Sequence, residues 1–439
     1  MASDVPAEFI SQPEDAQETR APSLLSRLGG GFHALRIRNY RLFIFGQVIS
    51  LTGSWMQTTA ESWLVLKLTN SPLVLGTMTT LQFLPVMILA LYGGVLADHL
   101  PKRRTLLVTQ CLFLVQATIF GLLVATETIQ LWQIYILAIF QGIVNAIDMP
   151  VRQAFVKEMV GRDDLVNAVA LNSMTFNTAR IVGPAIGGLL IAKIGIAPTL
   201  FLNAGSYIAV LGALWMMNEA ALFIPERSHK TPEPVLRQVR EGLSYAWRTP
   251  NILVILILVA AIGTFGYNFT VTLPLIAEFI LKTDAQGFGA LSSFLGLGSL
   301  IAAFGTVYIK EITMRRLFLG AGVFSLLLAA VAVVPVFGLT ALLLAALGAA
   351  SIVFSTGTNS LLQLLAPDEL RGRVMSINVL LIMGSTPIGA LLIGWFSEHL
   401  GVPITIFSCA VLCAVGVGFG LYYHRRYISP QTPELQTAP

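Results

Sequence analysis

The sequence predicts an all-helical membrane protein that crosses the bilayer twelve times. Composition indicates this class first, because 55% of the residues are hydrophobic and only 11% are charged, whereas soluble domains carry about 25% charged residues. Apolar segments of about 20 residues, the length that crosses the hydrocarbon core, follow one another almost without interruption. Since the bilayer interior offers no water to backbone groups, each such segment is expected to be an α-helix.

The predicted spans are separated by short connectors that contain most of the charged residues. Lys and Arg in particular interrupt the apolar runs, and the even number of crossings brings both ends of the chain to one side. In chain order the spans cover residues 42–66, 72–97, 105–126, 131–149, 168–195, 199–223, 251–281, 286–309, 317–337, 339–365, 374–398 and 402–424.

Basic residues predict the orientation of the chain in the membrane. All but four of the 27 Lys and Arg residues fall in the tails or in the connectors on the same side as the tails. The exceptions are Lys67, Arg180, Lys193 and Lys282. The positive-inside rule therefore predicts that both termini are cytoplasmic. This topology accounts for the net charge of +4, so no nucleic-acid partner is needed.

A hydrophilic break divides the spans into two sets of six. Its segment VLRQVREGLSYAW predicts an amphipathic helix on the cytoplasmic surface. The two sets resemble each other, since VGRDDLVNAVALNS before the fifth span matches LAPDELRGRVMSINV before the eleventh, and Pro184 and Pro387 lie about half the chain apart. Six-span repeats occur in transporters whose substrate site lies at mid-membrane. The expected domains are a tail with an interfacial segment at 1–41, helical bundles at 42–223 and 251–424, a linker at 224–250, and a tail at 425–439.

Five stretches carry a resemblance to a known family: SWMQTTAESWLVLKLTNSPLVLG, GGVLADHLPKRR, AIDMPVRQAFVKEMVGRDDLVNAVALNS, ARIVGPAIGGLL and APDELRGRVMS. They resemble the major facilitator superfamily, and within it the secretion-effector branch that includes enterobactin-exporter-like and macrolide-efflux-like proteins. The resemblance covers about residues 36–424. It implies two six-helix pseudo-repeats that move a solute by alternating access, in the inner membrane of a bacterium.

The loop after the second span resembles the family's cytoplasmic gate. Gly94 and Asp98 are followed by the basic residues Arg103 and Arg104. The glycine permits close helix approach, and the carboxylate can meet basic side chains or a helix N-terminus. The resemblance implies that Asp98 and Arg103 work with the start of the eleventh span and with Asp148 and Arg152 near the fourth. The alternative is an ordinary positive-inside loop with one solvated Asp.

Three ionisable residues inside the spans are candidates for proton coupling: Glu61, Arg180 and Glu278. An arginine at the bilayer centre costs about 2.5–3.5 kcal/mol on insertion scales, so Arg180 needs a partner or a wet cavity. It could bind a substrate anion, form a proton-sensitive salt bridge, or pair permanently with Glu61. Desolvation favours the neutral form of a carboxyl group, which makes Glu61 the first candidate to carry a proton. The alternative is a Glu that reaches the membrane interface, and Glu278 ranks second.

The fifth span contains Gly183, Pro184, Gly187 and Gly188, which resemble the signature of the superfamily's antiporters. Pro184 removes one backbone hydrogen bond, and the glycines allow another helix to approach closely. The resemblance implies a bend between the two halves that prevents proton leak. Simple helix packing is compatible with the same residues. Ala138 occupies the position of an arginine that the family carries in the fourth span.

The family resemblance implies a substrate cavity walled by spans one, four, seven and ten. These spans carry amide groups beside aromatic side chains such as Trp55, Phe265 and Phe269, and Pro274 predicts a break in the seventh. A mostly apolar pocket with scattered polar groups suits an amphipathic organic molecule. The predicted cavity residues are Gln57, Gln141, Asn145, Tyr267, Asn268 and Asn359.

These observations favour a secondary transporter that exports a siderophore or a drug-like compound in exchange for protons. Its expected partners are the small-molecule substrate, protons and the lipid bilayer, and the chain is expected to work as a monomer without cofactor or metal. Nucleotide-driven transport would need a phosphate loop of the form GxxxxGK[ST], which the sequence lacks. Import or uniport on the same fold is the main alternative. A membrane enzyme acting on lipids is disfavoured, because the five His residues are scattered and form no catalytic cluster.

Overall fold

The computed structural model describes the backbone of residues 33–223, 235–306 and 313–427, and their side chains except at 90–99, 235–239 and 427. All regular structure in these ranges is helical. The elements are η1 (His33–Arg36), α2 (Arg38–Thr69), α3 (Pro72–His99), α4 (Lys102–Ala125), α5 (Leu131–Val160), α6 (Leu165–Ile194), α7 (Ile196–Trp215), η2 (Glu219–Ala221), α8 (Val235–Arg248), α9 (Pro250–Phe265), α10 (Phe269–Leu275), the π-turn η3 (Ile276–Ile280), α11 (Ala285–Thr306), α12 (Met314–Val333), α13 (Phe337–Leu365), α14 (Asp368–Leu400) and α15 (Val402–Tyr427).

The all-helical prediction is confirmed, while the count of twelve spans stays a prediction. Within the described ranges, ten helical segments are long and apolar enough to cross a membrane, with Pro250–Ile280 counted as one. α2 and α6, at 32 and 30 residues, are also long enough to cross a membrane, but they are less apolar than the ten. α2 carries the buried side chains of Gln57 and Glu61, which explains why its composition departs from that of lipid-facing helices.

Two predicted spans differ from the helices that form. The span predicted at 199–223 ends at Trp215, because Asn39 of α2 binds both backbone groups of Asn218: its Nδ2 donates to the carbonyl at 2.8 Å and its Oδ1 accepts from the N–H at 3.0 Å. The span predicted at 251–281 does break, but between α9 and α10 and not at Pro274. Pro274 lies within α10, two residues before the π-turn begins.

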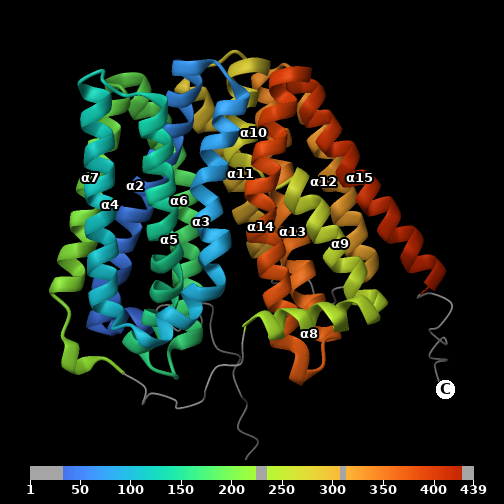
Figure 1. The fold of residues 1–439 in the computed structure, drawn as a ribbon, viewed down its shortest axis with the longest axis horizontal. Coiled ribbons are helices and arrows are strands. Elements are labelled where there is room, and N and C mark those ends of the chain that lie inside the picture. Colours follow the sequence, from blue (N-terminus) through green and yellow to red (C-terminus); the bar gives the residue numbers. More distant parts are fainter. Residues whose placement is uncertain (1–32, 224–234, 307–312, 428–439) are drawn as a thin grey trace, which may run out of the picture.

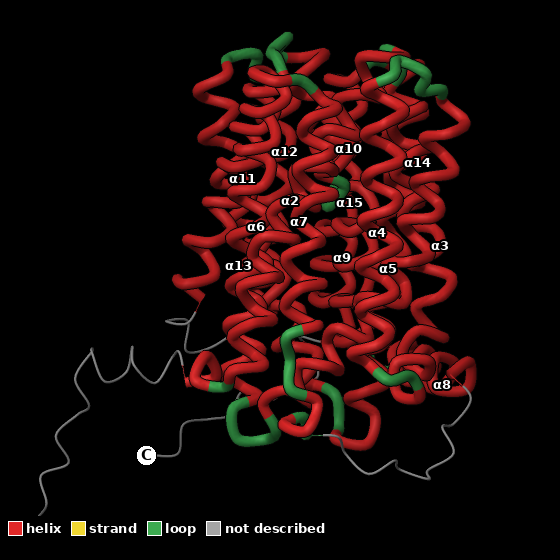
Figure 2. Tube along the Cα trace, turned by 90° about the vertical axis from the view of Figure 1, so that its left-hand side faces the viewer, coloured by secondary structure: helices red, strands yellow, loops and turns green. Residues whose placement is uncertain are grey.

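The helices form two groups whose packing repeats (Figure 1). In the first group α2 packs on α6 and α7, α3 on α5, and α4 on α5 and α7. In the second, α9 packs on α14 and α15, α11 on α13, and α12 on α13 and α15. Figure 2 shows the connecting loops gathered at the two ends of the bundle. The groups meet mainly through two equivalent contacts, α3 with α14 and α6 with α11.

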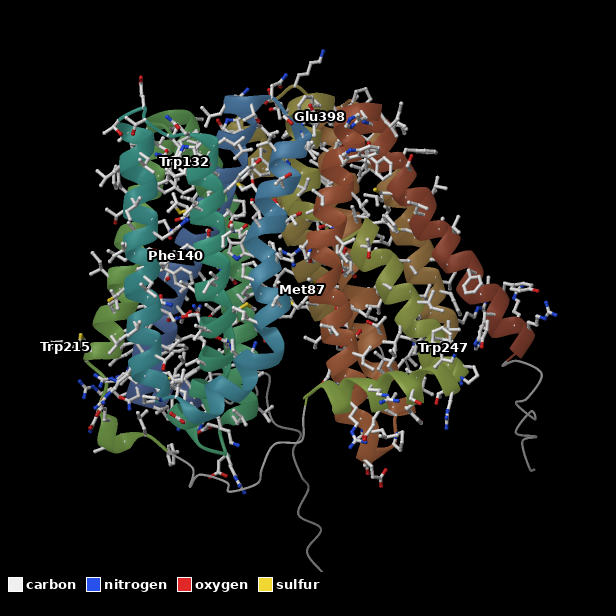
Figure 3. All side chains as sticks on the ribbon, in the orientation of Figure 1. Met87, Trp132, Phe140, Trp215, Trp247 and Glu398 are labelled. Carbon is white, nitrogen blue, oxygen red and sulfur yellow. The ribbon has the colours of Figure 1, made fainter. Side chains whose placement is uncertain are left out.

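Exposed tryptophans lie at two heights of the bundle (Figure 3). Trp132 lies near the upper end and is 58% exposed, whereas Trp215 and Trp247 lie low on opposite sides of the molecule. Tryptophan is enriched at the two interfaces of a membrane, where the ring can be half immersed. These positions are therefore those expected for a protein whose long helices cross a bilayer.

Candidate functional site

Glycines bring the two groups of helices into backbone contact along α6. A Cβ added to Gly188 would lie 2.4 Å from the Ala285 carbonyl oxygen of α11, and one added to Gly289 would lie 2.3 Å from the Pro184 carbonyl. On its other face, α6 packs on α2, where a Cβ on Gly183 would lie 2.4 Å from that of Trp55. Small residues permit such close approach within a membrane. The four signature residues of the fifth span therefore lie in the contacts between α2, α6 and α11.

Contacts of charged side chains between the groups lie at one end, which we call the Lys67 end. There the Lys67 ammonium lies 3.0 Å from the Glu278 carboxylate. The Glu398 carboxylate of α14 accepts hydrogen bonds from Ser71 Oγ at 2.7 Å and from the Leu73 N–H at 3.2 Å, at the start of α3. Glu398 lies at this edge in Figure 3. Glu278, a candidate for proton coupling, is thus a partly exposed member of an ion pair that joins the groups.

The face of α6 that packs on α2 and α11 becomes exposed toward the opposite end. Helix periodicity places residues three and four apart on one face. Along this face Val166 is 83% exposed and Phe176 43% exposed, Arg180 is half-buried, and Pro184 and Ile191 are buried. The two groups are therefore closed at the Lys67 end and separate beyond Arg180.

Arg180 lies at the point where this opening ends. It precedes Pro184 by one turn, and it projects between the side of α6 that contacts α2 and the side that contacts α11. Its ionisable neighbour is Tyr267 of the other group. Within the described residues no carboxylate lies within ion-pair distance of Arg180. The pairing with Glu61 considered from the sequence does not form.

Tyr267 occupies the break between α9 and α10, beside an aromatic cluster. Its hydroxyl donates to the Ser351 carbonyl at 2.7 Å, and its ring packs against Phe269, Phe324 and Phe354 with centroids 5.6–6.3 Å apart. The neighbouring Asn268 donates from Nδ2 to the Thr264 carbonyl at 2.8 Å. Its side chain therefore satisfies a backbone carbonyl at the break in the helix. Interrupted helices of this kind form substrate and ion sites in secondary transporters.

Glu61 is buried inside the first group of helices and not between the groups. It is 4% exposed and accepts a hydrogen bond from Gln57 Nε2 at 2.6 Å. Gln57 also donates to Gln116 Oε1 at 3.1 Å and accepts from Asn203 Nδ2 at 2.5 Å. This network joins α2, α4 and α7, and no Lys or Arg among the described side chains pairs with Glu61. Gln57, predicted as a cavity residue, belongs to the same interior network.

A second buried carboxylate, Asp148, is part of a network near the open end. It is fully buried, pairs with Arg152 one turn later, and accepts hydrogen bonds from Thr109 Oγ1 at 2.6 Å and Gln110 Nε2 at 2.9 Å. Arg152 also donates to Gln47 Oε1 at 2.6 Å. The structure thus brings together two of the predicted gate residues, Asp148 and Arg152, on one helix.

The remaining gate residues are arranged differently from the expectation. Arg103 does not reach Asp148: it pairs with Glu219 and donates from Nε to the Leu214 carbonyl at 2.7 Å, at the end of α7. The unsatisfied carbonyls at a helix C-terminus attract a guanidinium, which explains this choice of partner. Arg104 is exposed. The side chains of Gly94 and Asp98 lie outside the described residues.

The other predicted cavity residues are distributed over both groups. Gln141 is buried and accepts from Gln82 Nε2 at 3.0 Å, within the first group. Asn359 is half-buried and accepts from Asn378 Nδ2 at 2.9 Å, within the second. Asn145 is half-buried on α5. Of the six predicted residues, Tyr267 is the one that faces Arg180 across the groups.

Two polar residues of the site were not predicted from the sequence. Asn203 completes the network around Glu61, and Glu398 joins α14 to α3. Asn203 is an amide inside an apolar span, and this signal could have identified it. Glu398 lies at the end of a span, where acidic residues are common, so no signal in the sequence distinguishes it.

Long apolar helices in two repeated groups, joined by small residues and closed at one end only, define a multi-pass membrane transporter. Within the described residues, two groups of helices with equivalent packing lie side by side, as in transporters built from internal structural repeats. The chain belongs to the transmembrane secretion effector family of the major facilitator superfamily, whose family model matches residues 29–431. The family predicted from the sequence is thereby confirmed.

Two curated relatives and one solved structure are similar to this chain. The multidrug efflux pump Tap of Mycolicibacterium fortuitum is 26% identical over 84% of this chain and 92% of its own length. The staphyloferrin A transporter of Staphylococcus aureus is 25% identical over 90% of this chain and 98% of its own. The crystal structure of the nucleoside transporter NupG has a TM-score of 0.72 at 10% identity, covering 88% of this chain and 99% of that one. The last likeness concerns the fold alone.

Proposed function

We propose that the chain exports an amphipathic organic molecule in exchange for protons, by alternating access of one chain of twelve spans. The observation that carries this proposal is the one-sided closure: contacts at the Lys67 end, and an exposed face of α6 beyond Arg180. With both termini in the cytoplasm, as the basic residues predict, the opening faces the cytoplasm. Tap, a multidrug efflux pump by name, supports export, and the staphyloferrin A transporter supports transport of a small organic molecule.

The closure is of a kind that can be reversed. The Lys67 side chain is 51% exposed and that of Glu278 21% exposed, and exposed ion pairs contribute about 0–1 kcal/mol. Glycine contacts along α6 and α11 supply the larger share through close packing. The two groups, at 42–223 and 251–424, would exchange one closed end for the other by parting these contacts and forming new ones at the opposite end.

Glu61 is proposed as the residue that binds the exchanged proton. Its carboxyl group is buried among amides with no cationic partner among the described side chains, so its ionised form is poorly compensated. Loss or gain of one proton there would change the hydrogen bonds that join α2 to α4 and α7. Because α2 also packs on α6, a shift of α2 would reach the contact between the groups.

The test uses inverted membrane vesicles acidified inside by respiration, with a dye that is quenched at low internal pH. Addition of a transported compound is expected to restore fluorescence in vesicles with the native chain, and Glu61→Gln is expected to abolish this response. Glu127→Gln serves as the matched control, because Glu127 is exposed in the turn after α4. A full response in folded Glu61→Gln vesicles would remove Glu61 from the mechanism. No response in native vesicles to drugs and siderophores of every charge would overturn proton exchange.

A further inference from the structure

We infer that the transported molecule is an organic anion, and that Arg180 binds its carboxylate where the opening between the groups ends. This inference rests on the proposed function and names the substrate class of the same site. The first step is the unpaired charge of Arg180, which is half-buried and has no carboxylate within ion-pair distance among the described residues. An arginine in this position presents several donors in a planar fork, the geometry that a carboxylate matches.

The second step is that the two acids buried within the first group, and the acid at the closed end, are not available to a cationic molecule. Glu61 is enclosed inside the first group, and Asp148 is fully buried and paired with Arg152. Glu278 pairs with Lys67 beyond the closed contacts. A cation that entered the opening would therefore approach the positive charge of Arg180 without a free carboxylate to balance it. An anion would supply the missing partner.

The third step is the apolar surface beside the guanidinium. Phe176 lies one turn before Arg180 on the same face of α6 and packs edge-on against Trp55 of α2, with centroids 6.0 Å apart. Across the groups, Tyr267 presents the edge of the aromatic cluster of α10, α12 and α13. A flat apolar portion of the ligand would stack on these rings while its carboxylate reached Arg180.

The fourth step is the asymmetry of the two groups. Pro387 of α14 corresponds to Pro184 of α6, and the residue one turn before it is Met383. The cationic anchor thus exists on one side of the opening only, and the equivalent position on the other side is apolar. This arrangement fits a molecule with an anionic head and an apolar body better than one with charges at both ends.

The test compares three compounds that share one ring system: 2-naphthoate, 2-naphthamide and 2-naphthylmethylammonium. Binding to the purified chain is measured by equilibrium dialysis, and proton movement is measured in the inverted vesicles. We expect 2-naphthoate to bind about 10- to 100-fold more tightly than the amide, the usual worth of one charge-assisted pair. Arg180→Gln should remove this preference, Arg180→Lys should keep part of it, and Lys193→Gln, which removes a charge at the end of the same helix, should leave it unchanged.

The outcomes separate the substrate class from the proposed function. Preferential binding and proton movement with the ammonium compound, unaffected by Arg180→Gln, would overturn the inference while leaving proton-coupled export intact. Binding of 2-naphthoate that depends on Arg180, without proton movement, would support the inference and count against proton exchange. Equal binding of the three compounds, or no binding of 2-naphthoate to the folded chain, would overturn the inference.

Discussion

Replacing Gly188 by alanine is expected to open the Lys67 end of the protein. The added Cβ would lie 2.4 Å from the Ala285 carbonyl oxygen and 3.0 Å from the Gly289 Cα, where ordinary contacts are 3.4 Å or more. The two backbones must therefore separate by about 1 Å, and forced overpacking costs about 1–3 kcal/mol. Because the strain acts only in the conformation closed at this end, the balance between the two conformations should shift by about 5- to 150-fold.

The shift can be measured with a cysteine at Ser293. In the native chain Ser293 Oγ donates to the Ile181 carbonyl of α6 at 2.8 Å, beyond the Gly188 contact as seen from the Lys67 end. The free thiols at Cys111, Cys409 and Cys413 are first replaced by alanine. A membrane-impermeant maleimide added from the outside should label Ser293→Cys slowly in the native background and faster with Gly188→Ala.

Gly205→Ala is the matched control for this experiment. Gly205 lies in α7, and nothing lies within 4 Å of the position that its Cβ would take. The same chemical change there should leave the labelling rate unaltered, since alanine is simply a better helix former than glycine. Equal labelling rates in the two glycine variants would refute the idea that the α6–α11 contact closes this end.

Two further predictions concern the interactions around this closure and around Glu61. Asn203→Leu leaves the buried Gln57 Oε1 without its donor, so the chain should lose about 1–3 kcal/mol of stability. Thermal unfolding in detergent measures this loss. An unchanged melting temperature would show that the network is dispensable. Lys67→Glu should raise the rate of maleimide labelling from the outside at the Lys67 end, because it places two carboxylates together. The added change Glu278→Lys should restore the native labelling rate. Failure of this restoration would argue against a direct ion pair between residues 67 and 278.

Hydropathy predicted the helices well, because the cost of unsatisfied backbone groups in lipid acts on every residue of a span. The ends of spans were less accurate. The helix predicted to run to 223 ends at Trp215, since Asn39, far away in sequence, binds Asn218. The break in the seventh span was expected at Pro274 but occurs at Tyr267 and Asn268. A proline is visible in a sequence, whereas an amide that replaces backbone hydrogen bonds is recognised only in the folded chain.

The candidate site was predicted in its residue types but not in its partnerships. Glu61 and Arg180 were recognised because a charged side chain in an apolar span is costly wherever it lies. Their partners were not predicted, because the sequence of a span does not indicate which face of the helix packs against which other helix. Glu61 proved to lie among Gln57, Gln116 and Asn203, and Arg103 proved to pair with Glu219 and not with Asp148.

The sequence by itself determined the class, the family and the identity of the costly residues, since these follow from local composition and from contiguous motifs. Tertiary structure decided which helices touch, which end of the opening is closed, and that Arg180 has no carboxylate partner among the described side chains. The physical reason is that ion pairs and glycine contacts depend on distances of a few ångströms between segments far apart in the chain. Lys67 and Glu278, or Gly188 and Ala285, acquire their roles only when the two groups of helices pack together.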